Sequence, residues 1–299
     1  MSPFDLESPA DLAGALRLLS VNGDEAKLIA GGTGLINLMK QRLLFPSLLV
    51  SLHRVPGLDY VKEADDQILL GACTSLATVE RHPLIRNRLP MLSAALAEVA
   101  SPRVRARATI GGAVAHGDPH QDTPVALIAY GAQAVVRSKE GSRTVPLDAF
   151  YSDYYETVLG PDELVTEVIV PALPERHAGC YMKYLPRSAE DYATVAVGGV
   201  VTLSENGRVE SARVALGSVA ATPVLANGVG SALLGQDLSV ENVREIAVEA
   251  VIASLDPMSD ARGSAEYKRA MAVVFTRRVL ASLADQLGRS GGPVVNPQA

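Results

Sequence analysis

Residues 108 to 124 read ATIGGAVAHGDPHQDTP, and this stretch decides how the chain is interpreted. Its first half, Thr109-Ile110-Gly111-Gly112, is built of small residues that let a ligand approach the backbone closely. Its second half alternates four residues of metal-ligand type: His116, Asp118, His120 and Asp122. On an extended strand this spacing would project all four side chains to one side. The two halves therefore indicate two different kinds of site.

The metal interpretation has local features against it. Gly117 and Pro119 interrupt the segment, so a regular strand is not expected there. Asp122 precedes Thr123-Pro124 at the start of an apolar stretch and is a good N-cap for a helix over 122–131. We therefore predict no metal ligand in this chain. A metal-dependent hydrolase that uses the His116, Asp118, His120 and Asp122 cluster remains the alternative from another enzyme class.

A second glycine loop lies nearer the N-terminus, in KLIAGGTGLINLMK at residues 27–40. Residues 26–52 read as strand, loop, helix and strand, with the glycines at the first strand-to-helix turn. Paired glycines expose backbone N–H groups to anionic oxygens, and a helix start favours phosphate. The dinucleotide fingerprint G-x-G-x-x-G is incomplete, because Asn37 stands at its third glycine. A non-catalytic nucleotide-binding module is thus a second alternative.

The rest of the chain reads as a mixture of hairpins and helices. Hairpins are predicted over 59–72 and 133–147, helices over 75–85 and 90–100, and a Ser8-capped helix near the N-terminus. A boundary is expected in VPALPERHAG, where two prolines, a charge pair and a glycine occur together. Beyond it, two long strands joined at Asn206-Gly207 precede helices over 239–254 and 264–287.

The bulk properties exclude several classes of protein. The 299 residues are 48% hydrophobic and carry a net charge of −6, which disfavours nucleic-acid binding. No secretory signal or membrane span is visible, so a cytoplasmic location is expected. Only Cys73 and Cys180 are present. One [2Fe–2S] cluster takes about four thiolates, so this chain alone cannot hold one.

Taken with their neighbours, the two glycine loops resemble a known family. KLIAGGTGLINLMK and ATIGGAVAHGDPHQDTPVALIAYGAQAVV are similar to the two flavin-binding stretches of the FAD-binding medium subunit of molybdenum hydroxylases, the xanthine dehydrogenase and carbon monoxide dehydrogenase family. LGPDELVTEVIVP, YMKYLPRSAEDYATVAVG and ARGSAEYKRAMAVVFTRRVL resemble later segments of the same family, in order.

The resemblance implies an α+β fold. It consists of a two-part FAD-binding domain of the PCMH type over 1–175, with subdomains of about 1–56 and 57–175, and a smaller C-terminal α+β domain over 176–287. Residues 288–299 are expected to be a disordered tail.

The resemblance also implies the cofactor site, in which no residue need be catalytic because the flavin carries the chemistry. The first loop would wrap the FAD pyrophosphate, the second would close on it, and Asp122 would bind near the adenosine end. Leu164 and Lys183 would lie near the flavin, and Tyr192 near a ring face. The implied residues are Ile29, Ala30, Gly31, Gly32, Thr33, Gly34, Leu35, Thr109, Ile110, Gly111, Gly112, Ala113, Asp122, Leu164, Lys183 and Tyr192.

Three positions depart from the family pattern. The family usually has Asn at Ala113, Asp or Ser at Gly34, and Asn at His116. The implied function is that of an FAD-carrying electron-transfer subunit, which receives electrons from iron–sulfur clusters and passes them to an external acceptor. The [2Fe–2S] clusters and the molybdenum cofactor would then lie on a small and a large partner subunit of a heterotrimer.

Overall fold

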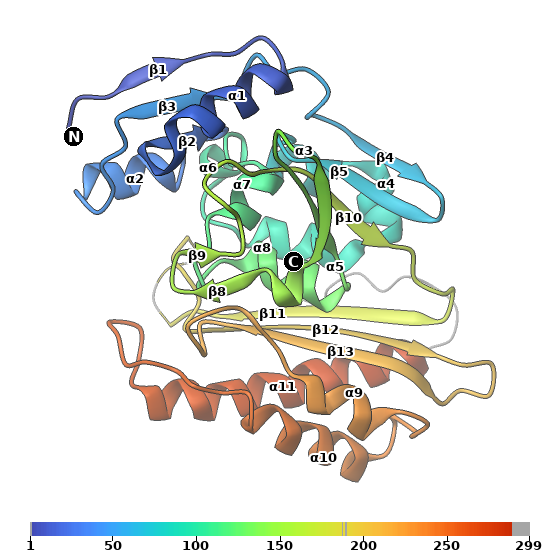
Figure 1. Cartoon of the computed structure of the whole chain (residues 1–299). Helices are drawn as coiled ribbons and strands as arrows, with labels where there is room; N and C mark the ends of the chain where they lie inside the picture. The colour runs from blue at the N-terminus through green and yellow to red at the C-terminus, as the bar shows by residue number, and fades with distance from the viewer. Residues whose placement is uncertain (1, 187, 189, 289–299) are drawn as a thin grey trace.

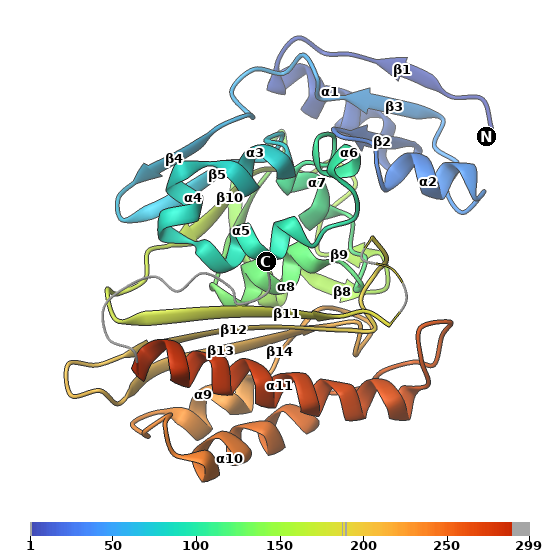
Figure 2. The same cartoon turned by 180° about the vertical axis from the view of Figure 1, so that it is seen from behind.

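The computed structural model describes residues 2–186, 188 and 190–288, and Figures 1 and 2 show them stacked in three layers. The predicted disordered tail lies outside the described residues except for Gly288, which ends the last helix. The outer layers are the N-terminal subdomain and the C-terminal domain, and the middle layer contacts both. The predicted α+β fold is confirmed. Within the described residues no helix is long and apolar enough to cross a lipid bilayer.

The N-terminal layer confirms the predicted strand–loop–helix–strand unit. It consists of β2 (Ala26–Ile29), α2 (Leu35–Lys40) and β3 (Leu48–Ser51), with β2 and β3 parallel. A further strand, β1 (Asp5–Glu7), was not predicted; it pairs with β3 to give the order β1-β3-β2. The predicted Ser8 cap is wrong: α1 (Leu12–Asn22) is capped by Asp11, whose carboxylate accepts the Gly14 N–H at 2.7 Å.

The middle layer is an antiparallel sheet of order β4-β5-β10-β6-β7 covered by short helices. Both predicted hairpins are present, and β10 lies between them as the central strand, which was not predicted. The strands are β4 (Val61–Ala64), β5 (Gln67–Gly71), β6 (Gln133–Arg137), β7 (Ser142–Pro146) and β10 (Leu164–Pro171). A small hairpin, β8 (Tyr151–Asp153) and β9 (Glu156–Thr157), follows the 3-10 turn Leu147–Ala149, and another 3-10 turn occupies Gly23–Glu25.

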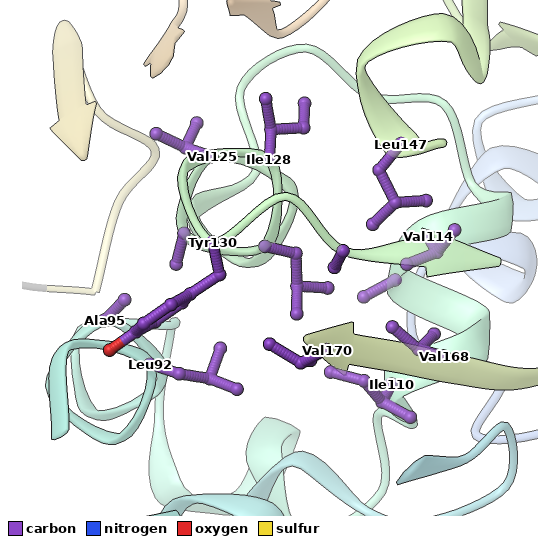
Figure 3. Packing of buried hydrophobic residues seen from close by; sticks show 14 of the residues in the cluster. Leu92, Ala95, Ile110, Val114, Val125, Ile128, Tyr130, Leu147, Val168 and Val170 are labelled. Atoms are coloured by element: carbon purple, nitrogen blue, oxygen red, sulfur yellow. The ribbon is translucent and has the colours of Figure 1, made fainter. Parts of the chain in front are cut away.

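The helices of the middle layer pack against its sheet and form the main hydrophobic core. They are α3 (Leu76–Arg81), α4 (Pro83–Arg88), α5 (Pro90–Ala97), α6 (Pro102–Arg105), α7 (Ile110–Ala115) and α8 (Asp122–Ala129). Figure 3 shows Tyr130, directly after α8, beside Leu92 and Ala95 of α5, whereas Val125 and Ile128 lie on the opposite side of α8. Every residue of α8 is buried. The segment after the second glycine loop is therefore fixed by apolar packing.

The C-terminal layer is a sheet with helices on its outer face. Its strands are β11 (His177–Tyr184), β12 (Val195–Leu203), β13 (Val209–Gly217) and β14 (Val224–Leu225), and its helices are α9 (Asn227–Leu233), α10 (Glu241–Ile252) and α11 (Ala265–Gly288). The predicted hairpin at Asn206-Gly207 is confirmed, with Gly207 at φ +78°. Strand β12 is buried along its whole length, because α8 packs on one face and α11 on the other.

Candidate cofactor-binding site

The first glycine loop leaves β2 and opens α2 with unpaired backbone donors. Gly32 has φ +75°, a left-handed conformation that favours glycine. Its carbonyl accepts the Ile36 N–H at 3.1 Å, and the Gly34 carbonyl accepts the Leu38 N–H at 3.1 Å. Among the described residues, the N–H groups of Gly32, Thr33 and Gly34 donate to no other group. This turn can therefore offer consecutive backbone donors to an anion.

The second loop uses its two glycines differently. Gly111 packs against β5: its N–H donates to the Ala72 carbonyl at 2.9 Å, and a Cβ there would lie 2.4 Å from the Ala72 Cβ. Gly112 is exposed, and its N–H donates to the Thr109 hydroxyl at 3.1 Å, which caps α7. Gly111 therefore fixes the loop, whereas Gly112 keeps its outer surface free of a side chain.

The two loops, far apart in the sequence, are in direct contact. A Cβ on Gly31 would lie 2.0 Å from the Arg107 carbonyl oxygen, so the first loop rests on the backbone that leads into the second. A Cβ on Gly34 would lie 2.5 Å from Nε2 of His116. In Figures 1 and 2 this contact lies where β2 and α2 approach α6 and α7. The fold thus brings the two predicted loops together.

Asp122 and Lys183 form a buried ion pair. Lys183 Nζ lies 2.9 Å from an Asp122 carboxylate oxygen and donates to the Glu98 carbonyl at 2.9 Å. The other Asp122 oxygen accepts the Tyr181 hydroxyl at 2.5 Å. The prediction that Asp122 is an N-cap is wrong: Gln121 occupies that position, and Asp122 is the first helical residue. The pair connects α8 to β11 of the C-terminal sheet.

Leu164 and Tyr192, the other two predicted site residues, lie in different surroundings. Leu164 is buried at the start of β10 and packs in the core of the N-terminal layer. Tyr192 is 41% exposed, and the Arg262 guanidinium stacks on its ring at 5.3 Å. Tyr192 is the predicted site residue outside the glycine loops that offers an open aromatic surface.

The alternating histidines and aspartates do not converge on one point. Asp118 is buried and accepts two hydrogen bonds from His120 at 3.0 Å, through its backbone N–H and its ring Nδ1. His116 contacts the edge of Tyr155 instead, while Asp122 is engaged by Lys183. Gly117 has φ +69°, so the segment is not a strand. No three His, Cys, Asp or Glu side chains within the described ranges are grouped as metal ligands.

Sequence reasoning missed Arg105, which holds the segment before the second loop. Its guanidinium binds Glu80 at 2.9 Å and the carbonyls of Val99 and Ala100 at 3.0 and 3.2 Å. Ala100 has φ +40°, a conformation that a non-glycine residue rarely adopts. Nothing in the local sequence indicates this role, since the arginine side chain acts on carbonyls brought near by the fold.

Family comparison agrees with this geometry. The profile described as "FAD binding domain in molybdopterin dehydrogenase" matches residues 2–173, and that described as "CO dehydrogenase flavoprotein C-terminal domain" matches residues 180–283. The chain belongs to the FAD-binding medium subunits of the molybdopterin hydroxylases. It is therefore a flavoprotein component of an oxidoreductase, as the resemblance implied.

Similar proteins span nearly the whole chain. The carbon monoxide dehydrogenase medium chain of Hydrogenophaga pseudoflava is 38% identical over 93% of this chain and 96% of its own length. The nicotine 6-hydroxylase medium subunit of Paenarthrobacter nicotinovorans is 35% identical over 91% and 94%. Among solved structures, carbon monoxide dehydrogenase from Hydrogenophaga pseudoflava matches with a TM-score of 0.91 at 36% identity, covering 96% of this chain and 98% of that one. A medium chain implies large and small partner subunits.

Proposed function

We propose that this subunit holds FAD between its two glycine loops, receives electrons from iron–sulfur clusters on a small subunit, and passes them to an external acceptor. The observation that carries the proposal is the direct contact between the loops, which sets the first loop, with its unpaired N–H groups, against the backbone that leads into the second loop and against His116. Two loops suit a pyrophosphate, which presents oxygens on two phosphates.

The fit of the cofactor rests on glycine positions that a side chain would fill. Gly31 and Gly34 leave no room for a Cβ because the second loop approaches them, and Gly32 adopts a left-handed conformation. Gly112 faces outward where its own loop is exposed. FAD, when bound, supplies the redox chemistry, while this chain supplies binding groups and electrostatics. We propose that residues 29–35 and 109–113 bind its pyrophosphate and that Tyr192 faces its ring.

The other redox centres of the complex are assigned to partner subunits. Cys73 lies in the core region of the N-terminal layer and Cys180 on β11, so the two cysteines belong to separate packing clusters. Since a [2Fe–2S] cluster takes about four thiolates, we assign the clusters to another subunit. Similarity to carbon monoxide dehydrogenase medium chains supports the assignment of the molybdenum cofactor to a further subunit. We therefore propose a heterotrimer with an iron–sulfur small subunit and a molybdenum-binding large subunit.

The test compares the large–small complex with and without this chain. A substrate panel drawn from the relatives' own names, carbon monoxide, nicotine and glyceraldehyde, is mixed with each complex. We expect substrate to reduce the iron–sulfur clusters in both, but an external dye acceptor to be reduced rapidly only when this FAD-loaded chain is present. Equal dye reduction without it, or substrate-dependent flavin bleaching in the purified chain alone, would refute the electron path.

A further inference from the structure

His116 occupies space between the two glycine loops that a side chain at position 34 would otherwise take. Nε2, Cε1 and Cδ2 of its ring lie 2.5, 2.8 and 2.9 Å from the position of a Cβ on Gly34. Glycine at position 34 therefore leaves the space that the His116 ring fills.

The imidazole is held firmly and has a free polar edge. Its ring packs edge-on against Tyr155 with centroids 5.3 Å apart, and the Tyr155 N–H donates to the Gly117 carbonyl at 2.9 Å. Within the described part of the chain, neither ring nitrogen of His116 makes a hydrogen bond. A half-buried imidazole placed in this way retains an unused donor.

The Nε2 atom of the ring lies next to Gly34, in the turn that carries the unpaired backbone donors. Nε2 borders Gly34, and the Thr33 and Gly34 N–H groups of that turn have no partner in the described chain. An oxygen that accepts from this turn lies within reach of the imidazole. Burial lowers the pKa of His116, although the charge of Asp118 opposes the shift. The ring is thus neutral at neutral pH and carries one N–H, which suffices for one hydrogen bond.

We propose that His116 is a ligand of the FAD pyrophosphate, donating from Nε2 to a phosphate oxygen held by the first glycine loop. The sequence alone assigned the site to backbone groups and left the histidines outside it. The structure instead adds one side chain from the second half of the 108–124 stretch. This inference rests on the proposed function only in taking FAD as the ligand of the two loops.

The test measures FAD affinity in the complete three-subunit complex after the flavin has been removed. His116→Phe keeps an aromatic ring against Tyr155 but has no N–H, whereas His116→Gln keeps a donor. His177→Phe changes a half-buried histidine at the start of β11, in the C-terminal sheet, and is the matched control. A hydrogen bond to a charged acceptor is worth about ten- to one-hundred-fold in the dissociation constant.

We expect His116→Phe to weaken FAD binding by about that factor, His116→Gln to recover most of it, and His177→Phe to match the wild type. The phosphorus-31 resonances of bound FAD should shift in His116→Phe and not in His177→Phe. Unchanged affinity in His116→Phe, or equal loss in His116→Phe and His116→Gln, would overturn the inference. Failure of the wild-type complex to bind FAD would instead overturn the proposed function itself.

Discussion

Replacing Gly31 with alanine tests whether contact between the loops creates the FAD site. The new Cβ would lie 2.0 Å from the Arg107 carbonyl oxygen, which is backbone and cannot rotate away. An ordinary carbon–oxygen contact is about 3.3 Å, so the loops must separate by roughly 1.3 Å. A phosphate hydrogen-bonded at about 2.9 Å to one loop would then lie beyond hydrogen-bonding distance from the other.

The expected loss follows from the hydrogen bonds that such a shift removes. A hydrogen bond to a charged group contributes about 1.5–3 kcal/mol. Loss of two of them costs at least about 3 kcal/mol, so the dissociation constant of FAD should rise by roughly one-hundred-fold. The strain of overpacking should also lower the free energy of unfolding by about 1–3 kcal/mol. We expect the Gly31→Ala complex to purify with little flavin.

The assay is flavin content by absorbance, followed by titration of the flavin-free complex with FAD. The control is Gly141→Ala, because Gly141 is exposed in the β6–β7 turn and a Cβ there meets no atom within 4 Å. The control should bind FAD like the wild type. If Gly31→Ala bound FAD with an affinity within about threefold of the control, contact between the two loops would not be needed to bind the cofactor, which would refute the prediction.

Two further predictions concern backbone conformation and pH. Gly32→Ala and Gly57→Ala both place a side chain at positive φ, +75° and +77°, and should strain the backbone alike by about 1–2 kcal/mol; only Gly32→Ala should weaken FAD binding, measured by the same titration. Burial disfavours the charge of Asp118, but hydrogen bonds and charge from His120 outweigh it and hold the pKa of Asp118 below its ordinary value. Its stabilisation is therefore present above about pH 4 and lost as pH falls through the lowered pKa. Asp118→Asn should lower the melting temperature at pH 7, and the deficit should shrink as the pH falls below about 4; a deficit that stays constant with falling pH would contradict this assignment.

Local sequence patterns predicted the elements whose cause is local. The Asn206-Gly207 turn and the hairpins of the middle sheet depend on turn residues and strand alternation next to them. Strands β1 and β10 were missed because their partners are distant: β1 pairs with β3, and β10 lies between β5 and β6. A strand of three residues, as in β1, carries too little pattern to be recognised without its partner.

In the candidate site, too, local features were predictable and features that depend on distant residues were not. Paired glycines identified both loops, but which glycine faces a ligand depends on atoms elsewhere in the chain. Position 111 requires glycine because Ala72 lies against it, and position 31 requires glycine because the Arg107 carbonyl lies against it. The break expected within the alternation from His116 to Asp122 is present, because Gly117 has φ +69° and interrupts the strand that the spacing would require. Spacing in sequence indicates a shared face only where the backbone is regular.

The Asp122–Lys183 pair makes the predicted role of these residues testable. Both side chains are buried, and both carboxylate oxygens are engaged within the protein, by Lys183 and by Tyr181. This arrangement indicates a connection between α8 and β11 that stabilises the protein before any cofactor binds. A residue that serves only as a cofactor ligand would leave the flavin-free protein equally stable when replaced. The two roles therefore differ in what they predict for the protein without FAD.

Removing one partner of a buried pair leaves an uncompensated charge, which costs about 3–5 kcal/mol. For Asp122→Asn or Lys183→Met we expect the melting temperature of the flavin-free chain to fall by roughly 6 °C or more. The double variant should lose less than the sum of the two, because no charge is then stranded. Arg277→Met, which breaks the exposed pair with Glu245, is the control and should change stability little. Single variants that melt like the wild type without FAD, yet bind FAD weakly, would assign the pair to the cofactor instead. Flavin content alone cannot separate the structural role of the pair from a role in binding FAD, because α8 comes after the second loop and loss of either role would lower flavin content. The melting temperature of the flavin-free protein separates the two roles.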